Sequence, residues 1–408
     1  MKQYKTIFIF AYYSYADPLF QSAILPYFIG LNKMESNLRF VLLTFEQEQF
    51  QLSKEKTEEV KNELLNENII WYSTKWHSGR FKFLKKTYDI LQSFLFSSFI
   101  ILRYRVDKIY SEAFPGAVMS HWLSRLFRKQ HLIHSFEPHT QYMLEAGVWN
   151  ENSWEVKLLK KYEIKVAKSA SHILTATQEM IQRLQNLNTS AKLIKAPSCV
   201  DTDLFKFSSK DRRKIRDQLG IGENDIVIIY LGKFGGMYME EEIFSFFQEL
   251  QKNQKLSFRF IILTGDDRMK LSSYISKFNL SEDKVYINKV SRDQVPGYLS
   301  ASDYGFVAVR QYPGKRFCSP IKDGEYWSCG LPIIIPKGIS DDYVYADREG
   351  IGIVIDDMSS TSIEKLGDKL VEWRKMDRGE LRQKCRSFAI KDRSVDKFKK
   401  TYLDIFTD

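Results

Sequence analysis

The residues best suited to chemistry lie between positions 317 and 336, in the run FCSPIKDGEYWSCGLPIIIP. Ser319 and Pro320 favour a helix start, since serine can cap a helix and proline suits its first turn. A Cys-Gly pair is placed to end that helix before a buried strand. The amides at the helix start, together with Lys322, would form a site for an anion such as a diphosphate. Glu325, one turn further on, could accept hydrogen bonds from both hydroxyl groups of a ribose.

Other polar residues follow strand-like runs elsewhere in the chain. Lys233 comes at the end of the apolar run 225–232, and Glu137 and His139 follow the run 131–136. Histidine suits proton transfer near neutral pH, and a carboxylate could orient it or an acceptor hydroxyl. The alternative is that His139 caps a helix while Glu137 interacts favourably with the dipole of that helix.

Strand-like runs alternate with helix-length segments along the chain, which implies parallel sheets covered by helices on both faces. In the first half the strand-like runs are 6–12, 39–45, 68–73, 108–112, 131–136 and 172–177, with helical segments at 18–31, 54–66 and 154–168. The pattern restarts with strand-like runs at 225–232, 258–265, 284–289, 303–309, 331–336 and 350–355. A chain of 408 residues also exceeds what one hydrophobic core usually serves.

We therefore predict an α/β fold of two Rossmann-like, doubly wound domains that face each other across a cleft. The boundaries are 1–197 for the first domain and 198–389 for the second, with the C-terminal helix, 390–408, packing back on the first. The polar stretch 198–213 is the predicted linker. In such folds, ligands bind at the carboxyl ends of the strands.

Several classes of protein are disfavoured by what the sequence lacks. No GxGxxG follows the first strand of either domain and no GxxxxGK[ST] occurs, which disfavours dinucleotide dehydrogenases and P-loop NTPases. The four cysteines form no CxxC pair, so a metal or disulfide framework is not expected and a reducing compartment is. The N-terminus lacks a signal-peptide pattern, and the longest apolar stretch, 90–102, is too short to span a bilayer. We expect a cytoplasmic protein.

The net charge of +10 raises three possibilities for the surface. Nucleic acid is disfavoured because no basic-aromatic RNA-binding motif or helix-turn-helix pattern is found. The segment 75–108 mixes basic residues with phenylalanines, as in helices that lie on anionic lipid, so the inner face of the cytoplasmic membrane is a possible partner. The alternative is a core-facing helix with an ordinary, solvated lysine surface.

The run S-P-x-K-x-x-E-Y-x-x-C-G-L-P-I-I at 319–334 resembles the nucleotide-sugar motif of GT-B fold, GT4-type (group 1) retaining glycosyltransferases. The resemblance implies that Glu325 binds the donor ribose, and that Ser319, Pro320, Ile321 and Lys322 hold the diphosphate and sugar. The residues at 230–233, Y-L-G-K, are similar to the family's Y-x-G-R, which assigns Gly232 and Lys233 to the diphosphate.

Two further segments resemble the family, with differences. Residues 199–205, CVDTDLF, are similar to its G-V-D-x-x-x-F linker, so we interpret Asp201 and Asp203 as turn residues rather than a metal-binding DxD. Residues 136–138, F-E-P, correspond to an H-E-P found in some members, which assigns Glu137 and His139 to the reacting centre. Phe317 stands where the family often has a glutamate, and the loop GKFGGMYMEEE lacks its usual second lysine.

The resemblance implies a metal-independent retaining transferase that moves a hexose from a nucleotide-diphosphate sugar to a glycan or lipid-linked acceptor. Cell-surface polysaccharide or lipopolysaccharide biosynthesis is the expected pathway, by analogy alone. Two alternatives stay open: a GT-B-fold sugar-nucleotide epimerase, and a non-catalytic GT-B subunit that binds a partner enzyme.

Overall fold

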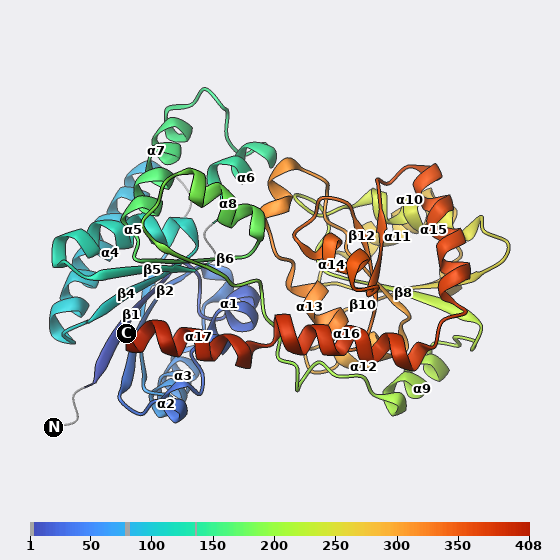
Figure 1. The fold of residues 1–408 in the computed structure, drawn as a ribbon, viewed down its shortest axis with the longest axis horizontal. Helices are drawn as coiled ribbons and strands as arrows, with labels where there is room; N and C mark the ends of the chain where they lie inside the picture. The colour runs from blue at the N-terminus through green and yellow to red at the C-terminus, as the bar shows by residue number, and fades with distance from the viewer. Residues whose placement is uncertain (1–3, 78–81, 135–136) are drawn as a thin grey trace. The chain divides into compact units, whose positions relative to one another are not determined.

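The computed structural model describes residues 4–77, 82–134 and 137–408. The chain forms two compact units, one of Met1–Pro197 with Val395–Asp408 and one of Ser198–Ser394 (Figure 1). The two units are built on separate sheets, with all strand pairs parallel in both. The predicted α/β, doubly wound architecture is confirmed for each unit.

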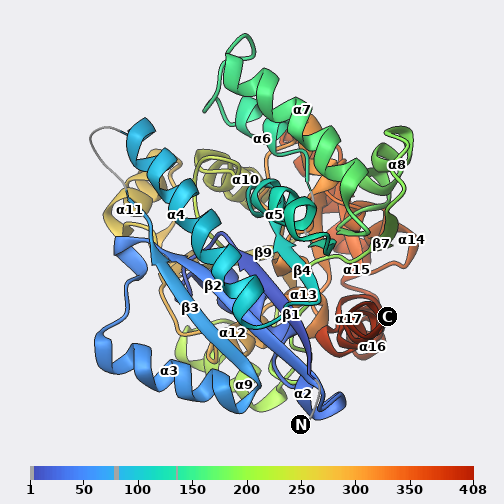
Figure 2. The same ribbon diagram turned by 90° about the vertical axis from the view of Figure 1, so that its left-hand side faces the viewer.

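The first unit holds a seven-stranded sheet in the order β3-β2-β1-β4-β5-β6-β7. Its strands are β1 Lys5–Ala11, β2 Leu38–Glu46, β3 Ile69–Lys75, β4 Lys108–Glu112, β5 Gln130–His134, β6 His172–Thr175 and β7 Lys192–Lys195. Its helices are α1 Pro18–Ala23, α2 Leu31–Met34, α3 Lys54–Asn66, α4 Lys82–Arg103, α5 Ala113–Phe127, α6 His139–Glu145, α7 Trp154–Ser169, α8 Gln178–Asn186 and α17 Val395–Thr407, with 3-10 turns η1 Leu25–Tyr27 and η2 Glu48–Phe50. Figure 2 shows α4 and α5 on one face of this sheet and α3 on the other. The chain order reverses between β1 and β4, where such sheets bind ligands.

The C-terminal helix α17 belongs to the first unit (Figure 1). The ammonium group of Lys108 donates a hydrogen bond of 2.7 Å to the carbonyl of Ile405. The ring of Tyr402 lies 5.0 Å from that of Tyr27. The helix before it, α16, remains in the second unit, so the chain crosses between units at Ser394 rather than near residue 390.

The second unit holds a six-stranded sheet in the order β10-β9-β8-β11-β12-β13. Its strands are β8 Asp225–Leu231, β9 Ser257–Leu263, β10 Val285–Asn288, β11 Tyr304–Phe306, β12 Ile333–Pro336 and β13 Gly352–Ile355. Its helices are α9 Ser209–Gln218, α10 Glu241–Gln251, α11 Arg268–Lys277, α12 Val295–Ala301, α13 Ile321–Ser328, α14 Asp342–Arg348, α15 Ser360–Trp373 and α16 Arg378–Arg393, with 3-10 turns η3 Glu282–Lys284 and η4 Pro313–Phe317. Helices α10, α11 and α15 pack on one face of the sheet, and α12, α13, α14 and α16 pack on the other.

Each predicted strand-like run contains a strand. The structure differs from the prediction in one additional strand and in two other segments. The strand β7 was not predicted, because its four residues, KLIK, are partly exposed and too few to show a pattern. The segment 18–31 is divided by Pro26, which cannot donate the amide hydrogen bond that a continuous helix needs. The predicted linker is irregular only to Ser208, whose hydroxyl caps α9 by accepting a hydrogen bond from the amide of Asp211.

Candidate functional site

The helix α13 begins at Ile321, two residues after Ser319. Pro320 is the N-cap residue and provides no side-chain hydrogen bond to the helix. The prediction that Ser319 caps this helix is therefore wrong. Its hydroxyl instead accepts hydrogen bonds from the amide of Ser198 at 3.0 Å and from the guanidinium of Arg393 at 2.6 Å. Because the first amides of a helix have no partner within it, the start of α13 still offers donors to an anion.

Glu325 is completely buried, and both of its carboxylate oxygens are paired with cations. Lys322 Nζ lies 2.9 Å from Oε2, and Arg292 Nη1 lies 3.1 Å from Oε1. The side chains of Lys322 and Arg292 are 34% and 40% exposed, whereas that of Glu325 is 0% exposed. The two cations, rather than the carboxylate, therefore present themselves to solvent. A ribose could reach Glu325 only if one of these side chains moved.

A tyrosine on α13 joins this helix to the end of β8. The amide of Leu231 donates a 3.0 Å hydrogen bond to the hydroxyl of Tyr326. The Tyr326 ring crosses β11 at Gly305, where a Cβ atom would lie 2.5 Å from the ring carbons. A larger residue at position 305 would therefore displace α13. This contact brings Gly232 and the exposed Lys233 to the same edge of the sheet as α13.

The loop after β8 is held by contacts within the second unit. Gly235 and Gly236 both have positive φ, and the loop pairs with the chain after β11 through a bridge between Tyr238 and Val309. The three glutamates that follow are all paired. Glu240 contacts Lys270, Glu241 contacts Lys277, and Glu242 contacts Arg310 at 3.0 Å. These acids fix the loop and the start of α10.

The structure shows the surroundings of Phe317, which departs from the family pattern, and of the linker aspartate Asp201. Phe317 is buried, and the guanidinium of Arg316 lies 4.9 Å from the centre of its ring. No carboxylate is therefore supplied at that position. In the linker, Asp201 Oδ1 accepts hydrogen bonds from the amides of Asp203 and Leu204, which is the geometry of an Asx turn.

A buried charged cluster lies behind the start of α13. Arg393 donates hydrogen bonds to the Ser319 hydroxyl, to the Ser198 carbonyl at 2.9 Å and to the carboxylate of Asp342. Asp323, on the first turn of α13, is also fully buried. Burial, and then the charge of Asp342, hold the pKa of Asp323 well above its ordinary value. The raised pKa favours the protonated form of Asp323, which can donate a hydrogen bond to Asp342.

Residues 211–392 match the model of the family described as glycosyl transferases group 1. The match covers most of the second unit, which is therefore similar to a group 1 glycosyltransferase domain. A search of the curated proteins by sequence found no match.

Solved structures similar to the whole chain support the GT-B fold. HepE from Anabaena, solved in complex with UDP, has a TM-score of 0.70 at 14% identity, with 99% of each chain covered. Sucrose-phosphate synthase from Thermosynechococcus elongatus has a TM-score of 0.71 at 12% identity, covering 99% of this chain and 98% of that one. A glycosyltransferase from Rickettsia africae has a TM-score of 0.68 at 14% identity, covering 100% of this chain and 98% of that one. At these identities, the similarity shows the fold alone.

Within the second unit, the sequence prediction missed two cations. Arg292 lies in the loop after the carboxyl end of β10, as Lys233 lies after the carboxyl end of β8. Position after a strand end, which indicated Lys233, could therefore have indicated Arg292 as well. Arg393 lies near the end of a helix far along the chain, and nothing in its sequence context indicates a contact with Ser319.

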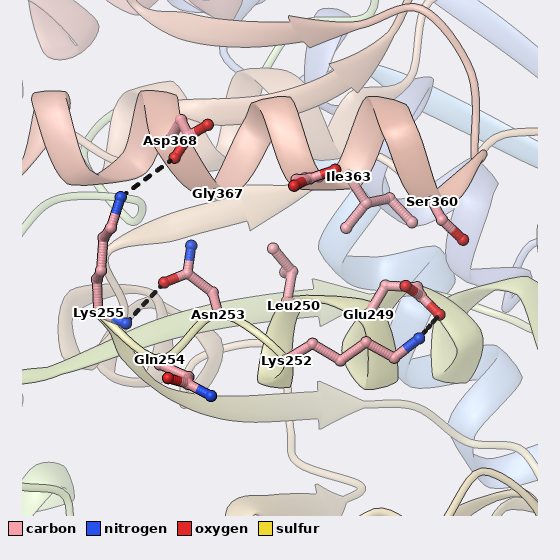
Figure 3. Close-up of a pocket in the computed structure, with 11 residues that line it drawn as sticks. Glu249, Leu250, Lys252, Asn253, Gln254, Lys255, Ser360, Ile363, Gly367 and Asp368 are labelled. Atoms are coloured by element: carbon pink, nitrogen blue, oxygen red, sulfur yellow. Dashed lines mark hydrogen bonds and ion pairs between the residues drawn. The ribbon is translucent and has the colours of Figure 1, made fainter.

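The structure also contains a pocket of about 530 Å³ on this domain, between α10 and α15 (Figure 3). Its charged residues largely neutralise one another, since Lys255 lies 3.8 Å from Asp368 and Lys252 lies 2.5 Å from Glu249. None of the predicted donor-site residues lines it. We therefore do not include it in the candidate site of the second unit.

His139, predicted to lie at the reacting centre, begins α6 in the first unit. Pro138 is the N-cap residue and provides no side-chain hydrogen bond to the helix, so the alternative that His139 acts as the cap is wrong. The imidazole instead lies 5.7 Å from the ring of Phe114 and 5.6 Å from that of Trp149. Glu137 accepts the His139 amide through its backbone carbonyl. The catalytic roles of Glu137 and His139 remain predictions.

Burial lowers the pKa of His139 below its ordinary value of 6.5. If this imidazole takes up a proton during transfer, kcat/KM should rise with pH through a value below 6.5 and then stay level, because only the neutral ring accepts a proton. His139→Gln should remove this acidic limb and lower kcat/KM by about 100-fold. A pH–rate profile from pH 5 to 8 checks this. An unchanged limb in the variant would assign the titration to another group.

Proposed function

We propose that the chain is a retaining glycosyltransferase that moves a hexose from a nucleotide-diphosphate sugar to a glycan or lipid-linked acceptor without a metal. The observation that carries the proposal is the set of cations at the start of α13, in a unit similar to a group 1 glycosyltransferase domain. Lys322 and Arg292 converge there on Glu325 at 2.9 and 3.1 Å. Lys233 lies at the end of β8, which Tyr326 joins to this helix.

These residues suit the departure of a nucleoside diphosphate. Lys322 and Arg292 each keep N–H donors beyond the one bound to Glu325, since an ammonium has three and a guanidinium five. Placed with the α13 amides, these donors would stabilise charge that develops on the leaving diphosphate. Glu325 would hold both cations in place before the donor arrives. His139 would handle the proton of the acceptor hydroxyl.

Two roles for Glu325 can be distinguished by experiment. As a ribose ligand, Glu325 must exchange a cation for the 2′- and 3′-hydroxyl groups when the donor binds. As an anchor, it keeps both cations and leaves the ribose untouched. HepE was solved with UDP, and uridine nucleotides are therefore the first to test.

Thermal-shift measurements with a panel of nucleoside diphosphates and their sugars test the proposal. A ligand present at 100 times its Kd stabilises the folded chain by about 2.7 kcal/mol. We expect one base to give the largest shift, and Lys322→Ala to reduce that shift. If Glu325 binds ribose, the 2′-deoxynucleotide should bind to the wild type more weakly than the ribonucleotide does. This difference in affinity should be lost in Glu325→Gln. No shift with any nucleotide at millimolar concentration would contradict the function and favour a non-catalytic subunit.

We further propose that the enzyme works at the inner face of the cytoplasmic membrane, in cell-surface polysaccharide or lipopolysaccharide assembly. In the part of the chain that the structure describes, no helix is long and apolar enough to cross a membrane. The support is α4, whose outward side exposes Tyr88, Leu95 and Phe99. Such a stripe, with the excess of basic residues in the chain, suits contact with anionic lipid.

A further inference from the structure

The first unit contains an apolar cavity of about 720 Å³ that is lined in part by residues of α4, α5 and α7. Its lining includes the ring of Phe10 at the end of β1, Tyr12 just after it, and Phe45 near the end of β2. From the helices and the chain between them come mainly aromatic and aliphatic side chains: Ile90, Leu91, Phe94, Phe114, Val118, Met119, Trp122, Trp149, Trp154, Leu158, Leu159 and Tyr162. The cavity thus lies at the carboxyl ends of β1 and β2, the edge where doubly wound sheets bind ligands.

The cavity holds few groups that could bind a sugar. Asp89 lines it, but its carboxylate already accepts the amide of His77 at 3.0 Å and the ring nitrogen Nδ1 of the same residue at 2.5 Å. Burial in these surroundings raises the pKa of Tyr12 and lowers that of His139. Sites for polar ligands carry several convergent hydrogen-bonding groups, whereas this lining suits a hydrocarbon.

The apolar surface continues out of the cavity along α4. On this helix, Asp89, Ser93 and Ser97 are buried, while most of the described side chains that face solvent are apolar. Leu91 and Leu95 are 59% and 70% exposed, and the stripe continues through Phe99 and Leu102. An ordinary surface helix turns mainly polar side chains to solvent, so this exposed apolar stripe is unusual. A chain in the cavity would therefore leave it over an apolar surface rather than into water.

His139 lies at the wall of this same cavity. Its ring packs on Phe114 and Trp149, which also line it. A molecule that filled the cavity with a hydrocarbon chain would therefore place any polar head group beside the histidine. The arrangement matches an amphiphile, with an apolar part for the cavity and a hydroxyl-bearing part for the reaction.

We propose that this cavity binds the hydrocarbon chain of an amphiphilic acceptor and places its sugar head at His139. The identification of the occupant as an acceptor depends on the proposed function, whereas the affinity for a hydrocarbon chain depends on the cavity alone. Each methylene group moved from water into the cavity strengthens binding by about fourfold, until the cavity is full.

Octyl, nonyl and decyl glucoside, kept below their micellar concentrations, are suitable probes for the full-length chain. Binding can be followed by tryptophan fluorescence, because Trp122, Trp149 and Trp154 line the cavity. We expect the Kd to fall by about fourfold with each methylene group added to the chain. Val118→Trp, which places a larger side chain in the lining, should weaken binding of decyl glucoside by at least about tenfold. Leu126→Trp, at an exposed position on the same helix, should leave it unchanged.

Two results would overturn the proposal. The first is a Kd that does not change with chain length or with Val118→Trp. The second is a loss of affinity in Leu95→Ser, on the exposed stripe, that equals the loss in Val118→Trp, since binding would then be at the surface. Nucleoside diphosphate binding is measured on the same variants as a separate test. It reports whether the donor site of the second unit is folded and binds as the proposed function requires. It should be unaffected by Val118→Trp, so a failure of the cavity proposal and a failure of donor binding can be told apart.

Discussion

Lys322→Ala should lower turnover by about 100-fold, a far larger effect than its effect on folding. Removal of one donor to a developing negative charge costs about 100- to 1,000-fold in kcat in other enzymes. Lys322 is placed for this role because it is one-third exposed at the first turn of α13 and is held by Glu325 at 2.9 Å. Transfer or hydrolysis of the nucleotide sugar that gives the largest thermal shift measures the effect.

Stability provides the control for this variant. Loss of Lys322 leaves the buried carboxylate of Glu325 with Arg292 as its partner at 3.1 Å, so some loss of stability is expected. The double variant Lys322→Ala/Glu325→Gln removes both charges of the pair and should recover the melting temperature but not the turnover. Lys369→Ala, an exposed lysine on α15, should change neither. Recovery of turnover in the double variant would show that Lys322 serves only to neutralise Glu325.

The architecture could be predicted because it depends on patterns that are local in the sequence. The strand β1, KTIFIFA, is buried at six of its seven positions, and such a run surrounded by helix-length segments indicates a central parallel strand. Likewise, the end of α13 was predictable, because Gly330 adopts a positive φ of 71° that favours glycine. These signals lie within a few residues of the feature they predict.

The candidate site was less predictable, because its contacts join residues that are far apart in the chain. Ser319 was expected to cap a helix, but the linker amide of Ser198 and the guanidinium of Arg393 occupy its hydroxyl. The position of Glu325 on α13 could be predicted, but its complete burial could not. That burial depends on Arg292, which a loop 33 residues earlier brings to the carboxylate.

The exposed side of α4 shows the same limit in another way. Its sequence is amphipathic, and periodicity alone favours burial of the more apolar side. In the structure, Ser93, Ser97 and Asp89 are buried on the same helix as Ile100 and Ile101, and Asp89 accepts hydrogen bonds from the backbone and ring of His77. A pattern within one helix does not show that a partner outside the helix holds a polar side chain on its inner side.

Arg393→Ala should destabilise the second unit more than any other single substitution considered for this chain. Arg393 is 1% exposed, and its side chain donates to Ser198, Ser319 and Asp342. Truncation of one partner of a buried ion pair costs about 3–5 kcal/mol, because the other charge stays buried and uncompensated. A loss of that size lowers Tm by about 10 °C in a domain of this size. Arg374→Ala, an exposed arginine in the same unit, should stay within about 0.5 kcal/mol of the wild type.

The pH dependence of this loss identifies its cause. The raised pKa of Asp323 lets the folded chain hold a proton that the unfolded chain releases above the ordinary Asp pKa of about 3.9, so this group lowers stability as pH rises above that value. Without Arg393, no cation offsets the charge of Asp342, and the decline should become steeper. Arg393→Ala should therefore recover stability as the pH falls from 8 to 5, and adding Asp342→Asn should recover most of it at pH 8. Denaturant unfolding at both pH values measures this. An equal loss at pH 5 and pH 8 would mean that Arg393 acts through packing against Trp327, 5.8 Å away, rather than through charge.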